Sequence, residues 1–152
     1  MAKKILRINM TDLKASYEDV PEKWARWGGR GLTSAITVDE VEPTCHPLGP
    51  NNKLVIAPGW VTGSPAAPSS GRTSFGGKSP LTGTIKEANS GGLSGQKIGK
   101  LGLAAIILEG TPQKDKWYTL VVDKDGVQFD DASDLVGKGM YKVDELLWEK
   151  YP

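Results

Sequence analysis

The chain has 152 residues, the length of one domain or of one domain with a small appendage. Its net charge of +1 gives no global field that favours nucleic acid or an anionic membrane, so we expect neither as a partner. One cysteine excludes an internal disulfide, and the longest apolar run, Leu101–Leu108, is too short to span a bilayer. Because the first residues also lack the apolar stretch of a signal peptide, we expect a cytoplasmic protein.

The first third of the sequence predicts two short strands and then a helix. Lys4–Met10 alternates apolar and polar residues as a strand does, and Thr11-Asp12 indicates a turn into a second strand. Pro21–Trp27 is expected to be a helix that Gly28-Gly29 stops, because proline favours the first helical turn and glycine follows the last. The β-branched content of Leu32–Val38 leaves helix and strand both open.

Short strands and loops are predicted for the middle of the chain. Leu54–Ala57 is an apolar run that should form a buried strand, and Gly59–Gly71 is a loop by composition. Arg72–Gly77 and Thr84–Ala88 should pair as an antiparallel hairpin around the turn Ser79–Gly83. That pairing places the residues that flank the two strands, on the side away from the turn, close together.

The last third predicts a helix, a strand, a hairpin and a closing helix. Ser90–Gly99 has helical spacing with Ser90 as a candidate N-cap, and Leu103–Glu109 should be a strand. Trp117–Asp123 and Val127–Phe129 should form a hairpin, because an Asp-Gly pair between them is a strong turn signal. One apolar face marks the closing helix: Met140, Val143, Leu147 and Tyr151. The whole is a β-rich α+β fold.

Gly28–Leu32 is the first of three glycine-rich segments that can carry chemistry. Its glycines allow close approach of the backbone, and Arg30 supplies a fork of hydrogen-bond donors. A helix C-terminus followed by a solvated arginine explains the same residues, and composition alone favours this structural interpretation.

Thr62–Arg72 and Ala88–Gly92 are the other two segments. The first exposes backbone amides between small side chains, and with Arg72 at its end it suits a phosphate or a polar heterocycle, or is a plain surface loop. In the second, Asn89 offers donor and acceptor atoms, and glycines at an expected helix start suit an anion; a capping turn is the alternative. Neither segment matches a Walker A or a dinucleotide fingerprint.

Soft metal ligands are nearly absent from the sequence. Cys45-His46 is the only such pair, whereas a zinc site needs three or four ligands, so we interpret the pair as loop residues. The chain offers no second histidine, which leaves a catalytic Cys-His dyad poorly supported. Trp60, which opens the glycine-rich loop, is the one tryptophan that we single out from those expected to fill cores and interfaces.

The same segments carry a resemblance to a known family. In chain order they are Ile5–Asn9, Gly28–Leu32, Pro47–Ala57, Thr62-Gly63, Gly71-Arg72, Lys78–Gly83 and Ala88–Gly92. Each motif alone is common, but the ordered set is specific and covers nearly the whole chain. On these motifs, residues 1–152 resemble the N-terminal, pterin-cradling domain of the tungsten-containing aldehyde ferredoxin oxidoreductase family. One departure is Trp60, at a position where many members have proline or a small residue.

The resemblance implies a fold and an activity. The fold is α+β: a β-rich domain of two packed sheets forming a saddle, with a few short helices and a C-terminal helix. The enzyme oxidises aldehydes to carboxylic acids and passes electrons to ferredoxin. It uses a tungsten or molybdenum bis-pterin with magnesium, and a four-iron–four-sulfur cluster in the full-length protein only. Its partners are ferredoxin, the aldehyde substrate and the remaining domains of the same enzyme, and a homodimer is left open.

The resemblance also implies roles for single residues. Arg72 matches an arginine that contacts a phosphate or the pterin, and Gly91 matches a backbone position that contacts the pterin. Asn89 matches the asparagine whose carbonyl helps to hold magnesium between the two pterin phosphates. Their neighbours complete the expected cofactor site: Gly71, Ser90 and Gly92.

We expect no catalytic residue in this chain, because the family's second pterin loop, cluster cysteines and acid–base residues lie beyond Pro152. The chain is therefore expected to be an inactive fragment of a longer one. The alternative is a stand-alone, non-catalytic pterin-binding or assembly subunit that docks a separate catalytic chain.

Overall fold

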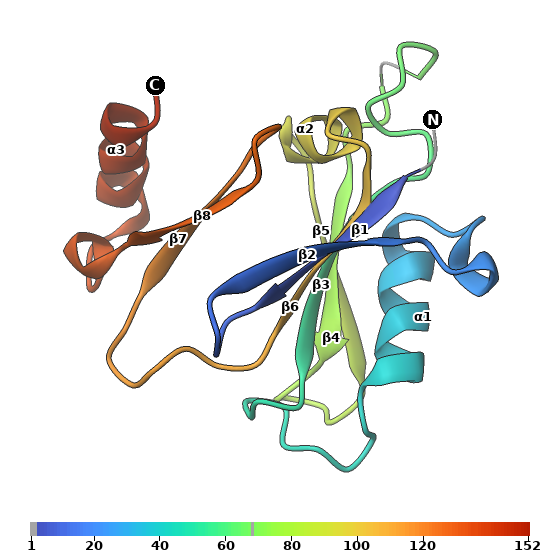
Figure 1. The fold of residues 1–152 in the computed structure, drawn as a ribbon, viewed down its shortest axis with the longest axis horizontal. Helices are drawn as coiled ribbons and strands as arrows, with labels where there is room; N and C mark the ends of the chain where they lie inside the picture. The colour runs from blue at the N-terminus through green and yellow to red at the C-terminus, as the bar shows by residue number, and fades with distance from the viewer. Residues whose placement is uncertain (1–2, 68) are drawn as a thin grey trace. The chain divides into compact units, whose positions relative to one another are not determined.

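A computed structural model describes residues 3–67 and 69–152. The chain forms two compact units, Met1–Thr111 and Pro112–Pro152, each with a β-sheet of its own (Figure 1). The first unit has strands β1 (Lys4–Asn9), β2 (Lys14–Asp19), β3 (Lys53–Pro58), β4 (Thr73–Lys78), β5 (Ile85–Ser90) and β6 (Leu103–Glu109). Its helices are α1 (Gly29–Glu40), α2 (Ser94–Lys100) and the 3-10 turn η1 (Glu22–Trp24).

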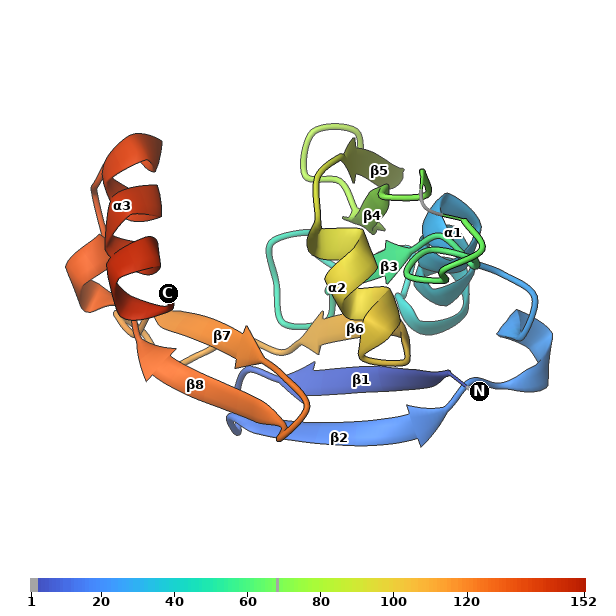
Figure 2. The same cartoon turned by 90° about the horizontal axis from the view of Figure 1, so that it is seen from above.

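The six strands of the first unit form one mixed sheet in the order β2-β1-β6-β3-β4-β5. β1 and β6 are parallel, and the other neighbours are antiparallel, as Figure 2 shows for β1 and β2. The strand predictions for this unit are confirmed. The apolar patterns of β1, β3 and β6 match the centre of a sheet with a covered face, whereas β2 and β5 are mostly exposed. β5 lies at one edge of the sheet.

The core of the first unit lies between α1 and the centre of the sheet. Ile5, Val55 and Ile107 come from three adjacent strands and are fully buried, as are Leu32 and Ile36 of α1. Leu32 and Ile36 are four residues apart, so they lie on one face of the helix. Burying such side chains stabilises the unit by roughly 1.5–3 kcal/mol for each, and it fixes the start of α1 beside the sheet (Figure 1).

The predicted helix over Pro21–Trp27 is wrong, because the glycines after it begin a helix rather than end one. Only the short turn η1 forms there, and α1 starts at Gly29 with Gly28 as an extended N-cap. A Cβ atom on Gly28 would lie 2.4 Å from the amide nitrogen of Trp60, so glycine is needed for the close approach of two backbones. The segment Leu32–Val38, for which helix and strand were open, is helical.

A second correction concerns Ser90, which is not an N-cap. It is the last residue of β5, and α2 begins later, at Ser94 with Leu93 before it. The ladder with β4 continues through Ser90, which pairs with Thr73. Sheet pairing therefore takes precedence over the local capping preference of serine.

The second unit is a hairpin and a helix. β7 (Tyr118–Val122) and β8 (Val127–Asp131) pair antiparallel, and α3 (Met140–Lys150) follows a short 3-10 turn, η2 (Ser133–Leu135). Asp123 closes the hairpin, because its side chain accepts hydrogen bonds from the amides of Asp125 and Gly126. The predicted hairpin and closing helix are confirmed, and so is the α+β class with two sheets.

The helices within the described ranges are all too short or too polar to cross a lipid bilayer.

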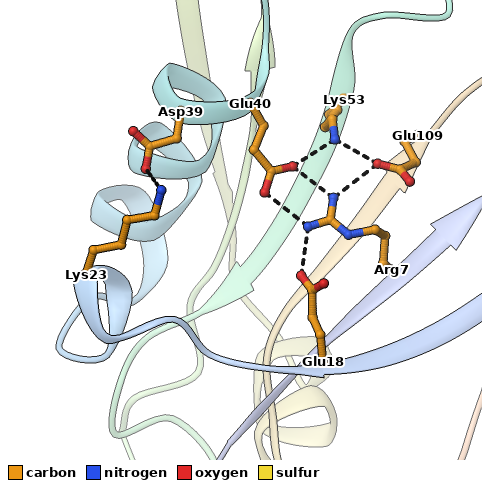
Figure 3. A network of polar contacts seen from close by, with 7 residues as sticks. All are labelled: Arg7, Glu18, Lys23, Asp39, Glu40, Lys53 and Glu109. Atoms are coloured by element: carbon orange, nitrogen blue, oxygen red, sulfur yellow. Dashed lines mark hydrogen bonds and ion pairs between the residues drawn. The ribbon is translucent and has the colours of Figure 1, made fainter.

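An ion-pair network, which the sequence did not reveal, ties α1 to the sheet (Figure 3). Arg7 lies 2.7 Å from Glu18, 2.8 Å from Glu40 and 3.1 Å from Glu109, and Lys53 lies 2.8 Å from both Glu40 and Glu109. Burial raises the pKa of Glu40 and of Glu109, but hydrogen bonds from Arg7 and Lys53 outweigh it and hold both below the usual value. The network therefore stabilises the charged carboxylates at neutral pH.

Candidate functional site

The open end of the β4–β5 hairpin brings together residues that the sequence singled out. Thr73 pairs with Ser90 and Ser74 with Asn89, while the turn that joins the strands lies at the other end (Figure 1). Arg72 immediately precedes β4. The prediction that Arg72 and Asn89 lie at the same end of the hairpin is confirmed.

Asn89 is held by a cross-strand hydrogen bond. The buried hydroxyl of Ser74 donates to the side-chain oxygen of Asn89 at 2.9 Å. The bond does not involve the side-chain amide nitrogen of Asn89. Because Asn89 is exposed and lies on an edge strand, this nitrogen and the backbone groups on the open edge are accessible to a ligand.

The backbone at Arg72 and Thr73 is fixed by the start of α2. Thr73 Oγ1 and Ser94 Oγ lie 3.1 Å apart. A Cβ atom on Gly95 would lie 2.7 Å from Thr73 Oγ1 and 3.0 Å from the carbonyl oxygen of Arg72, so only glycine allows this contact. The Arg72 side chain itself is exposed, and within the described residues it forms no ion pair or hydrogen bond. Its guanidinium is thus an accessible cation on a fixed backbone.

Gly91 and Gly92 form an open stretch of backbone beside Arg72. A Cβ atom on either would meet nothing within 4 Å, and Gly92 has a φ of +90°, which disfavours other residues. A Cβ atom on Gly71 would lie 3.0 Å from the Gly92 carbonyl oxygen, so the end of the long loop adjoins this stretch. Arg72, Asn89 and exposed peptide groups therefore share one surface, which offers a cation, amide donors and carbonyl acceptors.

The long loop before Gly71 is a chain of turns rather than an irregular segment. Amide-to-carbonyl hydrogen bonds run from Ser64 to Val61, from Ala67 to Ser64, and from Ser70 to Ala67. The buried Thr62 hydroxyl donates to the Ser70 carbonyl. Pro68, which belongs to the predicted loop, lies outside the described residues.

The start of α1 also adjoins the site, a relation that the sequence interpretation missed. A Cβ atom on Gly29 would lie 3.4 Å from Ser74 Oγ, the atom that bonds Asn89. Arg30 lies in the first turn of α1 rather than after a helix, and its largely exposed side chain pairs with Glu87 of β5. The glycine pattern was the available signal, but it was assigned to the wrong end of a helix.

The Cys45-His46 pair has a local structural role, as interpreted from the sequence. The Cys45 carbonyl accepts a hydrogen bond of 2.7 Å from Lys78, and His46 Nδ1 accepts one from the Leu48 amide. No group of three or more His, Cys, Asp or Glu side chains in the described part of the chain is arranged to hold a metal ion.

Residues 5–152 match the family described as aldehyde ferredoxin oxidoreductase, N-terminal domain. The chain belongs to this family. It is 41% identical over 137 residues to the tungsten-containing aldehyde ferredoxin oxidoreductase of Thermococcus kodakarensis, and 38% identical over 148 residues to that of Pyrococcus furiosus. These alignments cover 89% and 95% of the chain but 22% and 24% of the relatives. The chain thus spans about a quarter of their length.

A solved structure has the same fold as this aldehyde ferredoxin oxidoreductase domain. It is the active-site complex BamBC of benzoyl coenzyme A reductase, in complex with 1,5-dienoyl-CoA. The TM-score is 0.88 at 26% identity, over 99% of this chain and 23% of the other.

Trp60 stands at the rim of the aldehyde ferredoxin oxidoreductase domain, beside the start of α1. Its side chain is about half exposed, and its backbone contacts Gly28. Lys3 donates a 2.6 Å hydrogen bond to the Trp60 carbonyl and lies 5.2 Å from the indole centroid. The backbone of Trp60 is therefore held by its contacts with Lys3 and Gly28.

Proposed function

We propose that this chain is the cofactor-binding domain of a tungstopterin oxidoreductase that oxidises aldehydes to carboxylic acids with ferredoxin as the electron acceptor. The observation that carries the proposal is 41% identity to an enzyme named for tungsten, aldehyde and ferredoxin. Relatives with this name also favour tungsten over molybdenum. The acid–base residues and the iron–sulfur cluster belong to other parts of such an enzyme.

The open end of the β4–β5 hairpin fits a pterin that carries a phosphate. Arg72 has an exposed guanidinium without an ion pair or hydrogen bond to the described residues, and a phosphate accepts two parallel hydrogen bonds from such a group. Gly71, Gly91 and Gly92 expose peptide groups for the polar edge of a pterin, and Ser90 adds a hydroxyl. In this role the residues bind and orient the cofactor.

Asn89 fits the role of a magnesium ligand through its backbone carbonyl. Magnesium in phosphate sites keeps several waters and takes few protein ligands, so one carbonyl is an adequate contribution. The hydrogen bond from Ser74 fixes the side chain and thereby the peptide unit. When bound, the tungsten bis-pterin supplies the redox chemistry, and this chain supplies part of the surface that binds it.

A second candidate is an oxidoreductase acting on an acyl thioester. The solved structure with a TM-score of 0.88 belongs to a benzoyl coenzyme A reductase, so the fold also serves that chemistry. The higher identity to aldehyde oxidoreductases favours the aldehyde.

The test is metal and pterin analysis of the anaerobically purified protein, with assays of aldehyde-dependent ferredoxin reduction in the enzyme that contains this domain. We expect tungsten and phosphorylated pterin in the wild type and their loss in Arg72→Ala, with Arg26→Ala, another exposed arginine, as the matched control. Aldehyde oxidation without a pterin, or normal tungsten content in Arg72→Ala, would contradict the proposal. Bound pterin without any redox activity would favour a stand-alone pterin-binding or assembly subunit.

A further inference from the structure

Arg30 and Glu87 form an ion pair in which the two partners differ strongly in burial. Arg30 Nε lies 3.1 Å from Glu87 Oε2. The Glu87 side chain is only 10% exposed, whereas that of Arg30 is 73% exposed. Glu87 Oε1 is buried and has no hydrogen-bond partner among the described residues. A buried carboxylate thus holds an arginine whose outer part faces solvent.

The outer part of Arg30 is available to a ligand. In the described chain only its Nε atom is engaged, which leaves the N–H groups of both Nη atoms. An arginine anchored through Nε keeps these groups as a planar fork, and that fork matches two oxygens of a phosphate or carboxylate.

The position of Arg30 on α1 favours an anion as that ligand. Gly28 makes no side-chain capping bond, and the first turn of this 12-residue helix contains no acidic residue. The first amides of the helix therefore lack a side-chain acceptor, and the positive end of the helix dipole lies there. Glu87 already balances the charge of Arg30, but the free Nη groups of Arg30 and the first amides of α1 are hydrogen-bond donors, so both features suit the same kind of ligand, an anion.

Arg30 also adjoins the cofactor site described above. Glu87 and Asn89 are two residues apart on β5 and so lie on the same face of the sheet, opposite Gly76 and Ser74 of β4. The neighbouring residue of α1, Gly29, approaches Ser74 Oγ, which donates to Asn89. The start of α1 and the open end of the hairpin are therefore parts of one surface.

We propose that Arg30 is a second anion-binding arginine of this site, that it binds a phosphate monoester, and that Glu87 is the residue that positions it. This inference rests on the proposed function, since the pterin phosphate is the ester that such a site would meet. The start of α1 would then bind phosphate together with Arg72. Free inorganic phosphate has the same chemistry, so the test separates the two sources.

The test titrates the chain with three probes: inorganic phosphate, neopterin monophosphate and unphosphorylated neopterin. Calorimetry gives the affinities, and NMR follows the amides of Gly29–Gly31 and the Arg30 Nε–H group. We expect both phosphate-containing probes to shift these signals. Arg30→Lys keeps the charge but loses the fork, so it should weaken neopterin monophosphate binding about tenfold without changing neopterin binding. Arg26→Lys, an exposed arginine before α1, is the matched control.

Glu87→Gln distinguishes a positioning role of Glu87 from a purely electrostatic one, because the two predict opposite changes in the affinity for neopterin monophosphate. Removing a negative charge near an anion should tighten binding, if charge alone matters. If Glu87 positions Arg30, the variant should instead weaken binding of neopterin monophosphate, about threefold, because the fork is no longer held. Thermal unfolding of both variants checks that they remain folded, and the Arg30 Nε–H signal reports directly on the lost contact.

Each outcome separates this inference from the proposed function. Neopterin monophosphate that binds Arg30→Lys as tightly as the wild type would overturn the inference and leave the proposed function standing. Inorganic phosphate that binds at Arg30, with no preference for a pterin, would support the inference and count against the proposed function. Failure of every phosphate-containing probe to bind the wild type would overturn the inference, and unchanged or tighter binding to Glu87→Gln would remove the positioning role.

Discussion

Ser74 donates its hydroxyl hydrogen to the side-chain oxygen of Asn89, from the strand next to the edge of the sheet to the edge strand itself. This single bond lies where β4, β5 and the start of α1 meet, because Gly29 approaches the same hydroxyl. It therefore couples the geometry of a proposed magnesium ligand to the packing of a helix.

Ser74→Ala should loosen the proposed magnesium site more than the fold. Loss of one side-chain hydrogen bond costs about 1 kcal/mol of unfolding free energy. The freed Asn89 should lower magnesium and pterin occupancy in the cofactor-containing enzyme. Denaturant unfolding and metal analysis measure the two effects, and Thr82→Ala at the opposite end of the hairpin is the control. Full magnesium occupancy in Ser74→Ala would rule out this role.

Gly95→Ala and Gly91→Ala should have contrasting effects on stability. A methyl group on Gly95 meets Thr73 Oγ1 and the Arg72 carbonyl, so the variant should lose about 1–3 kcal/mol through overpacking. At Gly91 the methyl group meets open space, so stability should change little. If Gly91 contacts the pterin, Gly91→Ala should still lower pterin content. Equal unfolding midpoints for the two variants would show that α2 is not tightly packed against the backbone of Arg72.

The ion-pair network should make the first unit sensitive to acid. Glu40 and Glu109 have pKa values below the usual 4.5, so their contribution to stability is present above pH 4.5 and is lost as the pH falls below it. Glu40→Gln should therefore cost about 2 kcal/mol at pH 7, and the difference from the wild type should shrink as the pH drops below 4.5. Denaturant unfolding across this pH range measures the difference in unfolding free energy, with Glu22→Gln, at an exposed position, as the control. A difference that stays constant down to pH 2 would exclude the mechanism.

The isolated chain should contain no stoichiometric iron–sulfur cluster. It supplies one cysteine, Cys45, whereas such clusters commonly need four thiolates. Iron and acid-labile sulfide are measured in anaerobically purified protein, with a ferredoxin as positive control. Four irons per monomer would disprove the expectation.

The elements that the sequence predicted well are those whose signal is local. Leu103–Glu109 is a continuous apolar run and forms β6, and the Asp-Gly pair at Asp125-Gly126 closes the β7–β8 hairpin as its turn chemistry requires. The relation of Arg72 to Asn89 followed from hairpin pairing alone. These predictions needed no knowledge of distant residues.

The features that the sequence did not predict depend on contacts between distant segments. By a local rule, Gly28 and Gly29 indicate the end of a helix. In the structure, their lack of a side chain allows close contacts with Trp60 and Ser74, which are at least 30 residues away in sequence. Arg7 is one arginine in an alternating strand, and nothing in its neighbourhood indicates that Glu40 and Glu109 surround it. The packing of the two sheets into a saddle stays a prediction.

The parallel pairing of β1 with β6 has a consequence for biosynthesis. Residues 4–9 pair with β2 close in sequence, but their second partner is residues 103–109, so the centre of the first sheet cannot close until almost the whole first unit has left the ribosome. The β4–β5 hairpin, by contrast, pairs residues close in sequence. We therefore expect the hairpin that carries Asn89 to form early during translation. The surface that this hairpin shares with the start of α1 should form late, after β6 has paired in the sheet that packs against the helix.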